Sequence, residues 1–333
     1  MKRQVDKRGL RAGSATAWGL ALALFTEAAA AQEPLSPGGL EEISGRFLGA
    51  RMAASVVLGG SQATFDGAYH WDRRDAEADI YKIPWRIELN ETDPFALGST
   101  GLRGSWVLEG AGGYLQAEDF MRRTPLEGNK TSYDTVALGF GGGMRIYFTE
   151  DISVLPLIDA IYAYATSDFE PRNEAGRKIA AQFPSEYLSW ETHQWTAAPS
   201  LELRYRHWFD WLKVQYTVGY VFYHTDRFTR SSRISGFRSD AHMLKNELEL
   251  EVRTPWKIRG MPIHAAGFAS RSEFFDSLES GLLADHMYSS GGRAVLDVYG
   301  KMWKVQYIGP AAAYFWAPSF TGWTVGMEVD FLF

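Results

Sequence analysis

The stretch that decides the fold is residues 323–333, W-T-V-G-M-E-V-D-F-L-F. Every second residue is apolar, and the residues between them are small or charged, with Leu332 as the exception. An alternation with a period of two indicates a β-strand that has one apolar face and one polar face. In a soluble domain, an exposed apolar strand edge invites aggregation. A strand placed between lipid and a polar lumen satisfies both faces, so this stretch predicts a transmembrane β-barrel.

The first 31 residues have the features of a cleaved secretory signal peptide. A basic N-terminal part precedes the apolar run 15–25, which is too short to span a bilayer, and Ala29 and Ala31 fit a cleavage site before Gln32. Its removal lowers the basic and acidic residues from 34 and 40 to 29 and 38, which leaves a formal charge of −9. This acidic balance argues against a nucleic-acid partner.

The composition also favours a membrane-embedded barrel. The chain has no cysteine, but it contains 12 Trp, 16 Tyr, 20 Phe and 33 Gly. Beyond the predicted signal peptide the sequence holds no apolar run long enough for a transmembrane helix. Abundant aromatic residues are typical of the girdles of membrane barrels. A closed, hydrogen-bonded wall would stabilise an exported chain that has no disulfides.

A short polar leader, 32–39, is followed by a segment of helical period. The apolar residues of 40–58 recur at spacings of three and four. A helix of this length spans about 28 Å. Because that is close to the thickness of a bilayer core, we predict that the helix threads the lumen, with Arg46, Phe47 and Arg51 as plug residues. A helix at the periplasmic or outer surface is the alternative.

From residue 62 to residue 333 the period is two. We predict twelve strands, at 62–71, 78–89, 103–118, 131–148, 152–168, 187–206, 210–227, 243–254, 261–274, 286–299, 302–316 and 322–333. Tight periplasmic turns are expected at 149–151, 207–209 and 300–301, and longer outer loops at 119–130, 169–186, 228–242 and 275–285. Three connections do not fit this pattern: 90–102 and 255–260 are longer than a periplasmic turn should be, and the outer connection 317–321 is short. The loop 169–186 is expected to carry one or two helical turns.

Charged residues at every second strand position should face the lumen, because a Lys or Arg that faces lipid at the midplane costs about 2–4 kcal/mol. The predicted lumen-facing charges are Glu202, Arg204, Arg206, Lys213, Glu247, Glu249, Glu251, Arg253, Glu328 and Asp330. So many carboxylates repel one another unless they are paired. We therefore predict that Arg46 and Arg51 pair with the acidic row of Glu247, Glu249, Glu251, Glu328 and Asp330; contact of these arginines with water alone is the alternative.

The order of a helix, twelve strands and a terminal Phe resembles the translocator domain of autotransporters, and more narrowly the solitary autotransporter-type β-barrel family. The stretches that carry the resemblance are 46–48 with 55–58, 79–84 and 326–333. It implies an all-β, twelve-stranded antiparallel barrel, 62–333, in the outer membrane of a Gram-negative-type bacterium, with the helix 40–58 in the pore. It also implies that Val329, Phe331 and Phe333 are read by the barrel-assembly machinery. Only the leader separates signal from helix, so no passenger is expected.

These observations predict a plugged or narrow pore. Its expected surroundings are the lipid bilayer and lipopolysaccharide, and we expect a monomer without a cofactor. A surface-binding or structural barrel is the first alternative, using loops 119–130, 169–186 and 228–242. The last loop carries Arg230, Arg233 and Arg238, with Lys245 nearby, and these residues either contact lipopolysaccharide phosphates or are merely solvated.

An outer-membrane enzyme with an active site at the rim of the barrel is the second alternative. Its best candidate is the stretch His286-Met287-Tyr288-Ser289-Ser290. His286 and Ser289 lie on opposite faces of a strand, however, and cannot pair directly. His193 shares a face with Glu191, but no spacing typical of metal ligands stands out. We therefore expect no catalytic or metal site, and no enzyme.

Overall fold

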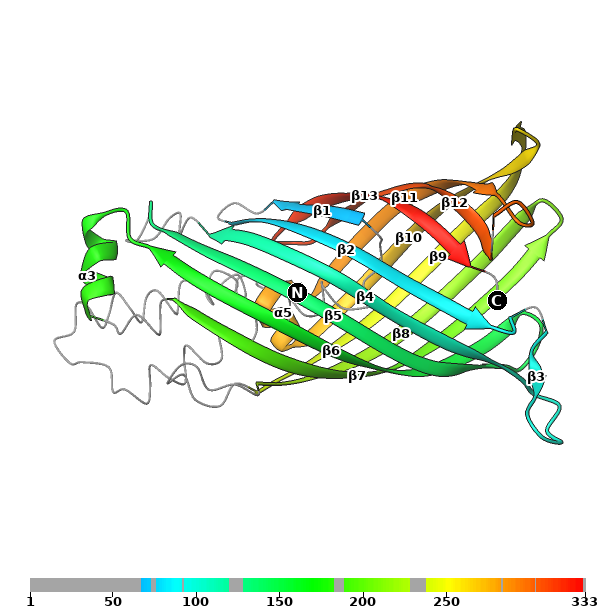
Figure 1. Cartoon of the computed structure of the whole chain (residues 1–333), viewed down its shortest axis with the longest axis horizontal. Helices are drawn as coiled ribbons and strands as arrows, with labels where there is room; N and C mark the ends of the chain where they lie inside the picture. The colour runs from blue at the N-terminus through cyan, green and yellow to red at the C-terminus, as the bar shows by residue number, and fades with distance from the viewer. Residues whose placement is uncertain are drawn as a thin grey trace, which may run out of the picture.

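A computed structural model describes residues 67–72, 76–91, 93–119, 128–182, 189–227, 238–282, 284–302 and 304–331. The predicted signal peptide 1–31, the leader 32–39 and the helix 40–58 with Arg46, Phe47 and Arg51 lie outside these residues, as do Arg230, Arg233 and Phe333. Most of the described chain forms antiparallel β-strands that are inclined to a common axis and enclose a lumen (Figure 1).

The strands form one continuous sheet. They are β1 (Gly67–Asp72), β2 (Ala76–Leu89), β3 (Phe95–Ala96), β4 (Arg103–Asp119), β5 (Lys130–Tyr147), β6 (Ile152–Glu170), β7 (Trp190–Phe209), β8 (Leu212–Arg227), β9 (Arg238–Ile258), β10 (Met261–Asp276), β11 (His286–Asp297), β12 (Val305–Trp316) and β13 (Thr321–Phe331). β2 pairs with β4, so the two-residue β3 stands outside the ring, and β1 pairs with both β2 and β13. These pairings close a ring of twelve strands, as predicted.

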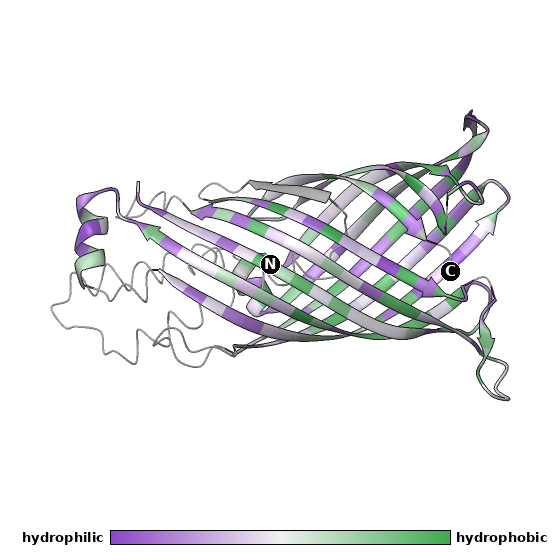
Figure 2. Ribbon diagram, in the orientation of Figure 1, coloured by the Kyte–Doolittle hydropathy of each residue, from purple (hydrophilic) through white to green (hydrophobic). Residues whose placement is uncertain are grey.

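The wall has two faces because its side chains alternate. Large apolar side chains such as Ile83, Leu138 and Met327 are more than half exposed on the outside, where lipid would cover them. Their neighbours in sequence, such as Lys82, Ala137 and Glu328, point into the lumen and are buried or half-buried. Hydrophobic and hydrophilic residues accordingly alternate along the strands in Figure 2.

Three predicted turns differ from those observed. The turn expected at 207–209 lies at 210–211, because Asp210 adopts a left-handed conformation (φ 49°) that a two-residue hairpin requires. The connection predicted at 255–260 is mostly strand, and Arg259 and Gly260 form its tight turn. The short turn predicted at 300–301 is instead the wider connection 298–304. The connection between β9 and β10 is therefore as short as the other hairpin turns. The connection 298–304 is instead longer than expected.

Most of the short turns lie at one end of the barrel and most of the long connections at the other; the long connection 90–102 and the short connection 317–320 are exceptions. We call these two ends the turn end and the loop end; β13 ends at the turn end, and helix α3 (Glu174–Gln182) lies at the loop end (Figure 1). α3 occupies the connection where helical turns were expected, and α5 (Ser277–Leu282) lies in another loop-end connection. None of the helices in the described part of the chain is long and apolar enough to cross a membrane.

The lumen has an apolar zone toward the loop end. α5 packs there against β9 and β10, and its residues Leu278 and Leu282 are almost fully buried. Ser319, in the β12–β13 connection, donates a hydrogen bond to the carbonyl oxygen of Leu282 at 3.0 Å. The larger lumen-facing members of the zone are Ile80, Leu115, Ile161, Val221, Tyr223, Met243, Phe274 and Phe315. The polar and charged part of the lumen therefore begins closer to the turn end.

Candidate functional site

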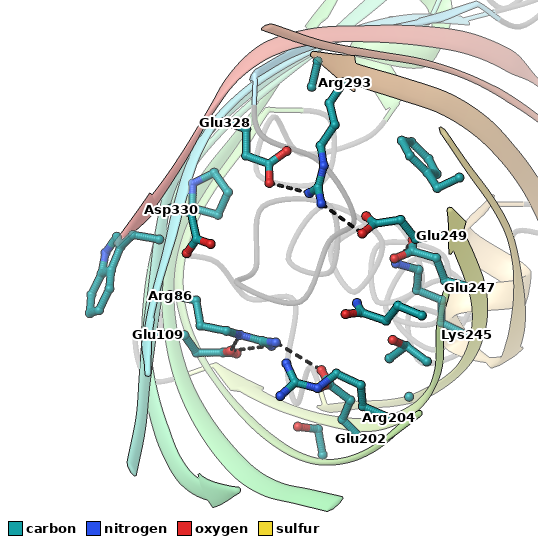
Figure 3. Close-up of a pocket in the computed structure, with 18 of the residues that line it drawn as sticks. Arg86, Glu109, Glu202, Arg204, Lys245, Glu247, Glu249, Arg293, Glu328 and Asp330 are labelled. Carbon is teal, nitrogen blue, oxygen red and sulfur yellow. Dashed lines mark hydrogen bonds and ion pairs between the residues drawn. The ribbon is translucent and has the colours of Figure 1, made fainter. Parts of the chain in front are cut away.

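Charged side chains from strands all around the ring converge on a cavity of about 400 Å³ inside the barrel (Figure 3). We call this part of the lumen the charged zone. Its cavity is lined by the charged residues Arg86, Glu109, Glu202, Arg204, Lys245, Glu247, Glu249, Arg293, Glu328 and Asp330. Because strand alternation directs each of these side chains inward, the same pattern that builds the wall also builds this site.

One network of ion pairs is centred on Arg145 of β5. This side chain is only 1% exposed and bonds to Glu88 of β2 at 3.1 Å and to Glu202 of β7 at 3.0 Å. Glu88 also accepts hydrogen bonds from the hydroxyl groups of Ser105 and Tyr147. The bonds to two carboxylates offset much of the free-energy cost of burying this charge. Because the three charged groups come from β2, β5 and β7, their bonds hold these strands at a set spacing.

Arg86 of β2 extends this network across the lumen. It bonds to Glu109 of the neighbouring strand β4 at 2.7 Å and to Glu202 of β7 at 3.1 Å. Strands β4, β5 and β6 separate β2 from β7 in the ring, so the Arg86–Glu202 pair crosses a chord of the barrel (Figure 3). A solute that passes this level must go around the pair or displace it.

A second network lies on the opposite part of the wall and is centred on Arg293 of β11. Arg293 bonds to Glu328 of β13 on one side and to Glu249 of β9, at 2.9 Å, on the other. Lys213 of β8 bonds to Glu251 at 2.6 Å and lies 3.7 Å from Glu249. Two cations of the wall thus neutralise much of the acidic row that the sequence places in the lumen.

Some carboxylates of the charged zone are not neutralised in this way. No cation among the described residues lies within ion-pair distance of Asp330, although Asp330 lines the cavity. Glu247 bonds at 2.7 Å to Lys245, two residues before it on the same strand. Of the charges that line the cavity, six are acidic and four are basic. The cavity therefore carries an excess of negative charge, which attracts cations.

The other predicted lumen charges lie at or near the turn end. Arg204 is 3.9 Å from Glu88, and Arg206 bonds to Glu91 at 2.8 Å. The guanidinium group of Arg253 lies over the ring of Trp208, at 4.3 Å from its centroid. Val329 is 38% exposed on the outer face, whereas the side chain of Phe331 lies outside the described residues.

Lys245, which the sequence placed in a strand near the basic loop 228–242, lies on β9 and faces the lumen. β9 begins at Arg238 rather than at 243, and Lys245 points from this strand into the charged zone. The outer part of β9 is polar on both faces, so its strand period was not visible in the sequence. Lys245 is therefore unavailable to lipopolysaccharide phosphates.

Sequence reasoning missed five charged residues of the site: Arg86, Glu88, Glu109, Arg145 and Arg293. All five occupy inward positions of strands that were correctly predicted, so extending the period-two pattern to single charges would have found them. Arg145 follows Gly141, Gly142 and Gly143, where the absence of side chains hides the alternation.

The histidines with described side chains are tied to neighbouring acids or phenols. His193 hydrogen-bonds to Tyr162 at 2.7 Å on the outer face, and His264 bonds to Glu251 at 2.9 Å in the lumen. His286 bonds to Asp285, whereas Ser289 points into the lumen and bonds to Ser270. His286 and Ser289 thus face apart. Within the described ranges, no group of three His, Cys, Asp or Glu side chains is arranged to hold a metal ion.

Two solved autotransporter domains have a similar fold. The β domain of the Bordetella autotransporter BrkA is 13% identical and aligns with a TM-score of 0.51 over 79% of this chain and 96% of its own. The transport unit of the autotransporter AIDA-I from Escherichia coli is 10% identical and aligns with a TM-score of 0.50 over 86% of this chain and 99% of its own. At these identities, the likeness concerns the fold alone.

The sequence itself identifies the family. No protein of curated function matches it significantly. Residues 61–309, which include most of the barrel, match the family described as the solitary outer membrane autotransporter beta-barrel domain. Together with the closed ring of twelve strands, this match shows that the chain belongs to the solitary outer-membrane autotransporter β-barrel family of Gram-negative bacteria.

Proposed function

We propose that this barrel is a narrow or plugged pore of the outer membrane. The observation that carries the proposal is the Arg86–Glu202 pair, which crosses the lumen beside a cavity of only about 400 Å³. Charged rings and bridges of this kind restrict a pore to small hydrated solutes, and they hold water that an apolar lumen would exclude. The restriction is thus built into the wall itself.

The predicted helix 40–58 has a defined place in this proposal. Glu249, Glu251 and Glu328 already have partners in Lys213 and Arg293, so they do not require the helix arginines. Asp330, together with the acidic excess of the cavity, supplies the attraction for Arg46 and Arg51. Glu247 likewise has a partner in Lys245. We propose that the two arginines pair chiefly with Asp330, rather than with the whole acidic row, when the helix occupies the lumen.

Planar-bilayer conductance of the refolded mature protein tests the pore, beside a version that lacks residues 36–58. A closed protein and an open truncated version would support a barrel plugged by its helix. Equal, steady conductance in both would support a narrow open pore and would place the helix outside the lumen. If neither conducts although both fold, the pore is rejected, and a surface-binding barrel that uses its outer loops becomes the better explanation.

The proposal includes no enzymatic activity and no cofactor. It takes the barrel to be exported through a cleaved signal peptide, folded by the barrel-assembly machinery and surrounded, as a monomer, by phospholipid and lipopolysaccharide. The bond of His286 to Asp285 supports the first point, because Ser289 faces the lumen and bonds to Ser270 instead. Hydrolysis of ester-linked lipids by the purified barrel would contradict it.

A further inference from the structure

The hairpin between β9 and β10 extends beyond the wall at the turn end. β8 accompanies β9 only as far as Val252, and β11 accompanies β10 only as far as Ile263. The six residues of β9 after Val252 add roughly 20 Å of strand at about 3.3 Å per residue. Figure 1 shows this hairpin bending away from the barrel axis at the turn end, in the upper right of the view. It therefore leaves the wall sideways, toward the surrounding membrane.

Large apolar side chains cover this part of the turn end. Trp256 is 69% exposed and Ile258 is 49% exposed, and both lie beyond Val252, the last residue of β9 that pairs with β8. In the adjacent β11–β12 connection, Tyr299 is 66% exposed and Met302 is 46% exposed. Trp and Tyr favour the boundary between hydrocarbon and water, because their rings are apolar and their N–H and O–H groups are polar.

Basic residues accompany these apolar side chains. Lys257, Arg259 and Lys301 are exposed, and no carboxylate of the described residues lies within ion-pair distance of them. The ammonium group of Lys301 donates to the carbonyl oxygen of Arg259 at 3.3 Å, which joins the two connections. The β5–β6 and β7–β8 turns carry Glu150, Asp151 and Asp210 instead. Positive charge thus gathers on one side of the turn end of an acidic protein.

We propose that the β9–β10 hairpin and the β11–β12 connection form a binding surface for anionic phospholipid headgroups. The turn end of such a barrel faces the periplasm, so the lipids are those of the inner leaflet. Trp256, Ile258 and Tyr299 enter the headgroup layer, and Lys257, Arg259 and Lys301 contact lipid phosphates. Basic residues near a membrane surface are attracted to anionic lipid, and this attraction adds to the burial of aromatic side chains. The surface is independent of the proposed pore.

The experiment uses the absence of cysteine in this chain. A Trp256→Cys variant is refolded, labelled with an environment-sensitive fluorophore and placed in nanodiscs of phosphatidylethanolamine, with or without a minority of phosphatidylglycerol. Quenching by acrylamide, which is uncharged, reports the exposure of the label to water. A Trp211→Cys variant is the matched control, because Trp211 is 65% exposed at the β7–β8 turn, follows Asp210 and has as its basic neighbour Arg253, whose guanidinium group lies over the ring of Trp208.

Phosphatidylglycerol should lower the quenching constant of the label at position 256 by about threefold and leave the label at 211 nearly unchanged. Adding Lys257→Gln, Arg259→Gln and Lys301→Gln should abolish the difference, and Lys257→Gln alone should reduce it. An equal response at both positions, or no response to phosphatidylglycerol at 256, would overturn the proposal. Protection of the label at 256 only after a periplasmic extract is added would also overturn it, in favour of a protein partner.

Discussion

Arg86 and Glu202 form an ion pair of 3.1 Å, although β4, β5 and β6 lie between their strands in the ring. The two residues are 116 positions apart in the sequence, and only closure of the barrel brings them together. The pair therefore joins two parts of the wall that are a third of the ring apart and occupies part of the lumen. Most of our predictions concern such links across the charged zone.

Removing the cross-lumen pair should widen the path for ions. Arg86→Gln shortens the side chain and deletes its charge, so we expect the single-channel conductance of the protein to rise by about twofold. Glu202→Gln should act in the same direction but also weaken the Arg145 network. Arg172→Gln is the control, since it removes an exposed ion pair with Glu170 at the loop end. Unchanged conductance in a conducting Arg86→Gln protein would show that the pair does not restrict the pore.

Removing the buried arginine should destabilise the wall. Arg145→Met leaves Glu88 and Glu202 without their shared cation, and we expect a loss of about 3–5 kcal/mol in the free energy of unfolding. Urea unfolding in lipid vesicles, followed by heat-dependent mobility on gels, measures this loss. The double variant Arg145→Met with Glu88→Gln should be less destabilised than the sum of its single changes, because one carboxylate is neutralised. Additive losses would refute the coupling.

Close approach of backbones should make one lumen glycine indispensable. A Cβ at Gly309 would lie 2.7 Å from the Cα of Val295 and would also collide with the carbonyl oxygen of Ala294. Gly309→Ala should therefore push β11 and β12 apart and cost about 1–3 kcal/mol of stability. Gly219→Ala is a matched control on another strand, because nothing lies within 4 Å of its added Cβ. Similar unfolding midpoints for the two variants would contradict this account.

The acidic excess of the cavity should make any current cation-selective. Asp330→Asn removes a carboxylate that has no described cation partner, so the ratio of potassium to chloride permeability should fall by about twofold. Reversal potentials in a salt gradient measure this ratio. Asp168→Asn is the control, because Asp168 is exposed at the loop end and bonds only to Ser189 among the partners seen. A preference for chloride in the unmodified protein would exclude this role for Asp330.

The sequence was sufficient to predict the wall because lipid imposes a strict period of two on it. β8 was predicted at 210–227 and is observed at Leu212–Arg227, and all twelve strands of the ring overlap the predicted ones. Hairpin turns were less predictable, because the alternation breaks down at strand ends such as His207-Trp208-Phe209, where two large aromatic residues are adjacent. Asp210 and Arg259 mark two turns through their left-handed backbones, and neither residue signals that conformation as strongly as glycine does.

The pairing inside the lumen could not be predicted from the sequence for a different reason. Alternation shows that Glu202 and Glu249 point inward, but the strand order and the stagger between strands decide which cation reaches them. Arg86 and Arg293 lie on strands β2 and β11, far from these acids in the sequence. The sequence suggested Arg46 and Arg51 as partners because Arg293 had not been assigned to the lumen.

The barrel wall is not equally strong all the way around. Among the described residues, β1 contributes six and meets β13 at five positions, whereas β4 and β5 are paired at seventeen positions, from Arg103 to Asp119. Since each paired residue adds hydrogen bonds, we expect β1–β13, the shortest pairing of the ring among the described residues, to require the least free energy to separate. Thermal fluctuations should therefore first open the ring at this seam and expose the edge of β13. A free edge can bind the strand of another chain, so the seam is also where this protein is most exposed to mispairing during folding.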